Sequence, residues 1–191
     1  MWTRRPPPGS PRRRRRFRRI GPEVDAAFKI RVARPADDAG IDTLLAASYP
    51  VLMAPGYDAA SLAAFLPIIT RANPVLLASG TFYVAETGDG GIIGCGGWSA
   101  ARPGSGKVEA GLAHLRHFAT HHGWARCGIG RALYETCEAA AQAAGVRRFE
   151  CYASLNAVAF YEALGFASVR GIELPMPRGV TAPAMLMERE I

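Results

Sequence analysis

The sequence contains no run that approaches the ~20 consecutive apolar residues of a membrane-spanning helix. Cysteine is scarce as well. The four cysteines, Cys95, Cys127, Cys137 and Cys151, form no CxxC pair and no metal-binding spacing with the four histidines. These absences predict no membrane span, no metal site and a protein of the reducing cytoplasm.

Acidic residues are missing from residues 1–19, which carry nine arginines. The whole chain has a formal charge of +7, from 23 basic and 16 acidic residues. Removing those nine arginines leaves 14 basic residues against 16 acidic ones, so the rest of the chain is slightly negative. The sequence therefore gives no sign of a nucleic-acid-binding surface outside the first residues.

Proline and arginine dominate residues 1–22. A segment of this composition cannot bury an apolar core, so we expect a disordered tail. Its function is left open between a solvated tail and an anchor that binds nucleic acid or another anionic surface through residues 4–19.

Strand and helix patterns alternate along residues 28–191, a length typical of one domain. A hairpin is expected around Gly88-Asp89-Gly90, and Pro67 is expected to kink or break its helix. The alternation after residue 110 predicts an α/β sheet that contains a parallel strand pair. The expected strands are 28–34, 81–87, 91–100, 110–120, 147–153, 166–174 and 184–190, and the expected helices are 37–48, 58–72, 128–144 and 155–164.

A glycine-rich turn, Gly128-Ile129-Gly130, opens the long helix expected over 128–144. The first turn of a helix has N–H groups without intrahelical partners, and glycine lets an anion approach them. A P-loop is excluded, because Ile129 and Gly130 stand where it needs Lys and Ser or Thr. A dinucleotide fingerprint fits weakly, because Leu133 replaces its third glycine, and a tight turn without a ligand is also open.

Two segments of the chain are similar to the paired motifs of one protein family. Ala125 to Gly130 is similar to Gln/Arg-x-x-Gly-x-Gly/Ala, with Ala125 in place of Gln or Arg. The run "RRFECYASLNAVAFYEALGF", residues 147–166, is similar to Asn-x-x-Ala-x-x-(Phe/Leu)-Tyr followed by Gly-Phe. Aligned on Tyr161, Ser154 stands at the Asn position. The two segments in this order resemble the GCN5-related N-acetyltransferase (GNAT) superfamily.

This resemblance implies a fold and a co-substrate. The fold would be a mixed, mostly antiparallel central sheet with a splayed parallel strand pair, flanked by helices, over residues 28–191. The co-substrate would be acetyl-CoA, with its pantetheine and acetyl groups against the main chains of Phe118 and Thr120. The other residues implied in its binding are Arg126, Cys127, Gly128, Ile129, Gly130, Arg131 and Ser154.

The resemblance also implies catalytic residues. Tyr161 matches the family tyrosine that donates a proton to the CoA sulfur, and a phenol of pKa near about 10 suits that role. His114 stands at the family's base position and should share a strand face with Phe118 by the period of two. Glu109 or a water chain is the alternative base, and His117 is expected to face the other way in a structural role.

The sequence thus predicts an N-acetyltransferase that moves an acetyl group to a primary amine of a small molecule or peptide by direct attack. Another acyl-CoA could take the place of acetyl-CoA. A function of a different class is also open: a catalytically silent acyl-CoA sensor, tethered to nucleic acid by the Arg-rich tail. The sequence does not name the amine, and it allows a dimer.

Overall fold

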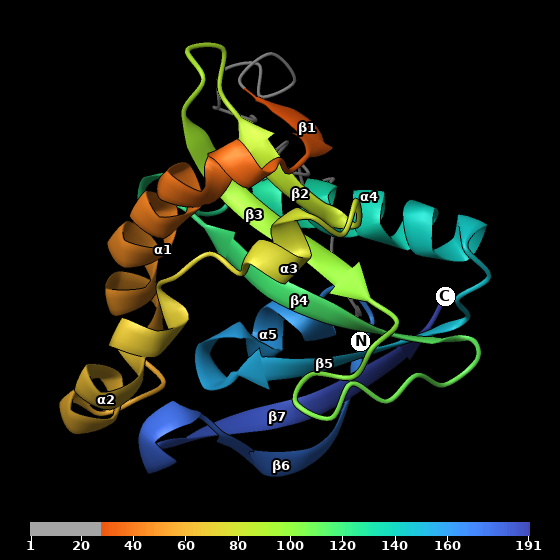
Figure 1. Ribbon diagram of the computed structural model, residues 1–191. Helices are drawn as coiled ribbons and strands as arrows, with labels where there is room; N and C mark the ends of the chain where they lie inside the picture. Colours follow the sequence, from red (N-terminus) through yellow and green to blue (C-terminus); the bar gives the residue numbers. More distant parts are fainter. Residues whose placement is uncertain (1–27) are drawn as a thin grey trace, which may run out of the picture.

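The computed structural model describes residues 28–191, and these form one seven-stranded sheet with helices on both faces (Figure 1). The strand order is β1-β2-β3-β4-β5-β7-β6, and every neighbouring pair is antiparallel except β4 and β5. The strands are β1 Lys29–Val32, β2 Phe82–Glu86, β3 Ile92–Ser99, β4 Leu112–Thr120, β5 Arg148–Ser154, β6 Ala167–Pro175 and β7 Thr181–Glu190. The expected mixed sheet is confirmed, while the predicted tail lies outside the described residues.

Two helices cover opposite faces of the sheet. Helix α1 (Asp38–Met53) packs Ile41, Leu44 and Leu45 against the face that carries Val84 and Cys95. Helix α4 (Ile129–Ala143) packs Ile129, Leu133 and Cys137 against the face that carries Ala85 and Phe149. The remaining helices are α2 (Ala59–Ile69), α3 (Pro74–Leu77) and α5 (Val158–Glu162), with short 3-10 turns at Pro35–Asp37, His122–Trp124, Leu155–Ala157 and Pro177–Gly179.

The first helix runs past its expected end near residue 48, and the second is not broken at Pro67. Helix α1 continues through Pro50 to Met53, and α2 runs through Pro67 to Ile69. A proline removes one backbone hydrogen bond, and both prolines stand in the last turns of their helices. Met53 and Phe65 are buried together in a separate apolar cluster, and we attribute the extra helical turns to this packing.

The parallel pair β4 and β5 is splayed. It is hydrogen-bonded only where Leu112, Ala113 and His114 face Arg148, Phe149 and Glu150. Beyond this point β4 keeps its partner β3 and β5 keeps its partner β7, so the two central strands separate. The splayed strand pair expected from the resemblance is thus confirmed.

A β-bulge in β4 overturns the predicted alternation of its side chains. Between the pairs Cys95–Ala119 and Gly97–Arg116, two residues of β4 face one residue of β3. One of the two, His117, has a left-handed φ of 56°, which is unusual for a residue with a side chain. Phe118 therefore packs in the same apolar cluster as Leu115 and not on the His114 face.

No helix within residues 28–191 combines the length and hydropathy needed to cross a membrane. The same residues contain no group of His, Cys, Asp or Glu side chains arranged to hold a metal ion.

Candidate functional site

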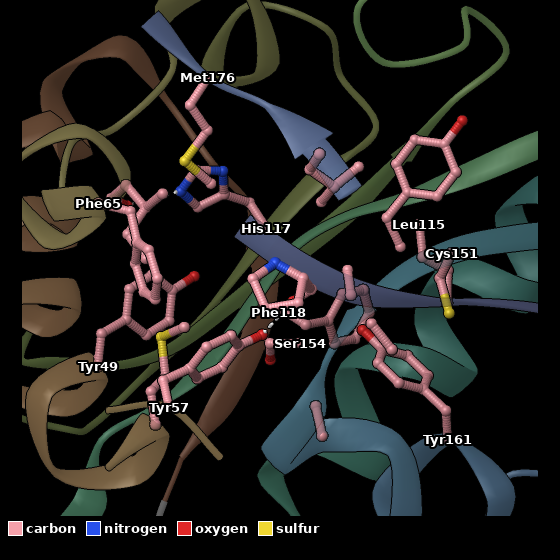
Figure 2. Close-up of a pocket in the computed structure, with 18 residues that line it drawn as sticks. Tyr49, Tyr57, Phe65, Leu115, His117, Phe118, Cys151, Ser154, Tyr161 and Met176 are labelled. Atoms are coloured by element: carbon pink, nitrogen blue, oxygen red, sulfur yellow. Dashed lines mark hydrogen bonds between the residues drawn. The ribbon is translucent and has the colours of Figure 1, made fainter. Parts of the chain in front are cut away.

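A cavity of about 250 Å³ lies where β4 and β5 separate (Figure 2). Its floor comes from the two splayed strands, through side chains such as Leu115, Phe118 and Cys151. Helices α1, α2 and α5 and the hairpin β6–β7 supply its walls. The cavity therefore depends on the splay, because a fully paired β4 and β5 would close it.

Tyr161 of α5 lies at one end of this cavity. Figure 2 shows its ring pointing from α5 toward the floor near Phe118 and Ser154. The side chain is buried among Phe118, Phe160 and Phe166, with ring centroids 6.4, 5.0 and 5.5 Å from its own. Burial raises its pKa well above the usual value, so the hydroxyl stays protonated at neutral pH and can donate.

The glycine-rich loop before α4 has an open, left-handed backbone. Arg126 has a φ of 66°, and Gly128, the N-cap residue of α4, has a φ of 85°. No side chain caps this helix, and the position of a Cβ on Gly128 is free of neighbours within 4 Å. The N–H groups of the first turn, from Ile129 to Arg131, thus have no side-chain cap and lie next to a glycine with open space beside it, which suits an anion.

The second glycine of the loop, Gly130, is required for close packing and not for its backbone conformation. A Cβ on Gly130 would stand 3.0 Å from the Phe160 ring and 3.8 Å from the Thr120 hydroxyl. Glycine is needed here because α4 packs closely on α5 and on the end of β4. The loop thus contacts α5 at Phe160, the residue next to Tyr161, and contacts β4, the strand that carries Phe118, at Thr120.

The other residues implied in cofactor binding surround this end of the site. Phe118 and Ser154 line the cavity, and Thr120 ends β4 beside the loop. Cys127 is partly exposed, while the Arg131 guanidinium is exposed and lies 3.4 Å from the carbonyl oxygen of Ala163. The structure therefore places Phe118 and Ser154 in the cavity and the loop residues at the start of α4, with Thr120 beside Gly130 and Arg126 exposed.

His114 is placed away from the cavity. Its side chain is 2 % exposed, and its Nδ1 lies 3.6 Å from the Glu150 carboxylate without a hydrogen bond. Burial, together with Arg102 and Arg116, lowers the pKa of His114 to about 4. The alternative base Glu109 is half-exposed and pairs with Arg148, and it does not line the cavity either.

His117, which sequence reasoning assigned a structural role, lines the cavity. The bulge turns it toward Tyr49 of α1, whose ring centroid is 6.5 Å from that of His117 (Figure 2). Its Nε2 lies 3.3 Å from the carbonyl oxygen of Ile69. A carbonyl only accepts, so Nε2 carries the proton and Nδ1 keeps a free lone pair. Burial lowers the pKa of His117 below its usual value. No sequence signal marks this bulge.

Four aromatic residues outside the two motif segments divide into two groups. Tyr49 and Tyr57 line the cavity, whereas Trp98 is buried in the main core and Trp124 packs against it. Apart from Tyr49, the individual side chains of α1, α2 and the β6–β7 hairpin that complete the cavity do not stand out in the sequence. Their apolar character does not distinguish them from ordinary core residues.

Comparisons with known proteins agree with the fold described above. Residues 78–168 match the family model described as an acetyltransferase (GNAT) domain. A GCN5-related N-acetyltransferase from Rhodopseudomonas palustris has a similar structure, with a TM-score of 0.70 at 20 % identity over 86 % of this chain and 96 % of that one. The PaiA N-acetyltransferase from Thermoplasma acidophilum, solved in complex with coenzyme A, gives a TM-score of 0.64 at 16 % identity over 86 % and 99 %. A search of curated proteins found no match.

Proposed function

We propose that this chain, whose residues 78–168 match the acetyltransferase (GNAT) domain, transfers an acetyl group from acetyl-CoA to a primary amine by direct attack. The observation that carries this proposal is the cavity at the splayed strands, which has a buried tyrosine at the end nearest an uncapped helix N-terminus. The cavity can hold a thioester and an amine, and the helix end can hold a phosphate.

The cofactor is proposed to bind along β4 and the start of α4. Backbone N–H groups from Ile129 to Arg131 would hold the pyrophosphate, since Gly128 leaves their approach open. Residues of β4 beyond His114 have no partner on β5, so the main chains of Phe118 and Thr120 border the gap in which the pantetheine amides would lie. Arg126 and Arg131 would add positive charge near the phosphates.

The chemical step needs one proton donor and one proton acceptor. The amine nitrogen attacks the thioester carbonyl carbon, a C–N bond forms, and the C–S bond breaks. Tyr161 gives its hydroxyl proton to the departing sulfur and is reprotonated through solvent, while a base takes the surplus proton of the nitrogen. Tyr161 is protonated at neutral pH, as any phenol of ordinary or raised pKa is, so it can give its proton to the thiolate that forms beside it.

We assign the base role to His117 in preference to His114. His117 lines the cavity and has a free Nδ1, whereas His114 is sealed beside Glu150 with a pKa of about 4. A base must lie within reach of the proton that it removes, and this geometric requirement favours His117. The alternative is a chain of water molecules that carries the proton of the amine to solvent.

Turnover tests the proposal. Acetyl-CoA is incubated with a panel of primary amines, free CoA is measured as released thiol, and CoA binding is measured by calorimetry. We expect amine-dependent CoA release. Tight CoA binding without release for any amine would favour the sensor, whose tether, residues 4–19, lies outside the described residues. The comparisons give the sensor no support, and longer acyl-CoA donors in the same assay test the choice of acyl group.

A further inference from the structure

The wall of the cavity opposite Tyr161 is apolar, and we infer that the acceptor is a compact primary amine with an uncharged, aromatic or aliphatic body. This inference rests on the proposed function. We call this wall the acceptor side; it consists of Tyr49, Met53, Tyr57, Phe65, Ile69 and Met176. Figure 2 shows Tyr49, Tyr57 and Phe65 together at the end of the cavity away from Tyr161.

No Asp, Glu, Lys or Arg side chain within residues 28–191 lines this cavity. The nearest charged residue along β4 is Arg116, which stands between the lining residues Leu115 and His117 but bonds the Ser99 hydroxyl at 2.8 Å. His117 is neutral at pH 7, because burial lowers its pKa. A carboxylate or a second ammonium on the acceptor would lose its hydration here without gaining a partner, which is costly.

One residue of the acceptor side, Tyr57, is held by both packing and hydrogen bonds. Tyr57 packs edge-on against Phe65, with ring centroids 5.1 Å apart. The Tyr57 hydroxyl accepts from the N–H of Leu155 and donates to the carbonyl oxygen of Pro183, both at 2.9 Å. The Tyr57 side chain thereby connects the segment before α2 by hydrogen bonds to the turn after β5 and to β7. An aromatic wall fixed in this way favours a flat or compact apolar group by shape.

The size of the cavity limits the acceptor further. Its volume of about 250 Å³ must also admit the acetyl group and the end of the pantetheine arm. Pockets for drug-sized ligands span roughly 300–1,000 Å³, so little room is left for a long chain. The apolar wall also lowers the pKa of the bound ammonium, because burial disfavours its charged form. The neutral, attacking amine is thus favoured by the same surface that selects its body.

Matched amines test the inference. We compare 4-methylbenzylamine with p-xylylenediamine, which adds a second ammonium group to the same ring, and 2-phenylethylamine with phenylalanine and spermidine, by CoA release. The two monoamines with uncharged bodies should exceed their charged counterparts in kcat/KM by about 10²-fold, the scale of an unpaired buried charge. Equal or faster turnover of the diamine, phenylalanine or spermidine would overturn the inference and leave the acetyltransferase proposal standing. Absence of turnover with every amine would overturn both.

A matched pair of variants at Met176 tests the wall itself. Met176 lies in the turn between β6 and β7 and is partly exposed, so a polar residue there is compatible with folding. Met176→Glu should lower kcat/KM for 4-methylbenzylamine about 10-fold and raise it for p-xylylenediamine by a similar factor, with Met176→Gln as the uncharged control. Identical preferences in the two variants would show that charge at this wall does not select the acceptor, against the inference.

Discussion

The two ends of the cavity are built in different ways. The end near Tyr161 is lined by Phe118, Ser154 and Tyr161; we call these residues, together with Thr120 and the loop up to Gly130 beside them, the donor side, and all lie within residues 112–166 of the chain. The acceptor side collects residues from α1, the segment before α2, α2 and the β6–β7 turn, over residues 49–176. The donor side uses backbone groups and glycines, while the acceptor side uses ordinary apolar side chains.

This difference explains why one side carries a sequence signature and the other does not. Binding a phosphate with backbone N–H groups requires a particular helix start and residues without a bulky Cβ, as at Gly128. An apolar wall can be formed by many combinations of Leu, Met, Phe and Tyr, provided that they fill the space. Substrate preference can therefore diverge while the donor side stays recognisable. The following substitutions probe this contrast, from the largest expected effect to the smallest.

A carboxylate in the phosphate loop should have the largest effect. Gly128→Asp places a negative charge at the N-terminus of α4, and we expect CoA affinity to fall by about 10²-fold or more, since like charges at close range repel strongly in a partly desolvated site. Gly128→Asn is the matched control, because Asn and Asp tolerate left-handed backbone similarly. Calorimetry of both folded variants is the measurement. Equal losses of affinity in the two would point to backbone strain and not to a phosphate site.

Gly130 is a poorer position for this experiment. A side chain there would meet Phe160 at 3.0 Å, so loss of binding could follow from displaced packing next to Tyr161.

Removing the Tyr161 hydroxyl should slow turnover on the order of 10²-fold, the lower range for general acid catalysis, and leave CoA affinity nearly unchanged. Tyr161→Phe keeps the ring among Phe118, Phe160 and Phe166, so folding should be preserved. Steady-state kinetics and CoA calorimetry on the same preparation separate the two effects. Turnover close to that of the unsubstituted protein would leave Tyr161 with a packing role only.

The base assignment predicts a pH effect. The pKa of His117 lies below its ordinary value of about 6.5, so the residue becomes protonated, and turnover falls, only as the pH drops below that value. His117→Gln should slow turnover about 10²-fold and flatten this acidic limb. His114→Gln is the control and should keep the limb. If the acidic limb of the pH–rate profile disappears in His114→Gln and persists in His117→Gln, His114 is the base and the assignment to His117 is wrong.

The smallest effect is expected on the acceptor side. Tyr57→Phe leaves the N–H of Leu155 and the carbonyl of Pro183 without their shared partner, and should lower the free energy of unfolding by about 1 kcal/mol. It should raise KM for the amine several-fold without changing CoA affinity. Denaturant unfolding and two-substrate kinetics measure these quantities. A change in CoA affinity as large as the change in amine KM would contradict the separation of the two sides.

Much of the fold followed from local patterns. The hairpin around Asp89, the helix that begins at Ile129 and the strand β5 were predicted within a few residues, because each pattern has one period and clear ends. The two proline-containing helices were predicted too short or broken, since burial of Met53 and Phe65 favours continuation, and burial is not a local property.

The sequence by itself showed the resemblance to the GNAT superfamily, the candidate phosphate loop and the candidate tyrosine, because these depend on a glycine loop and a short helix that are each contiguous in the chain. The tertiary structure decided which histidine faces the cavity. An inserted residue opposite Gly96 shifts the alternation of β4, so that His117 lines the cavity and His114 is buried beside Glu150. It also decided that the acceptor side is apolar, since segments distant in sequence meet there only after the sheet has formed and β4 and β5 have separated.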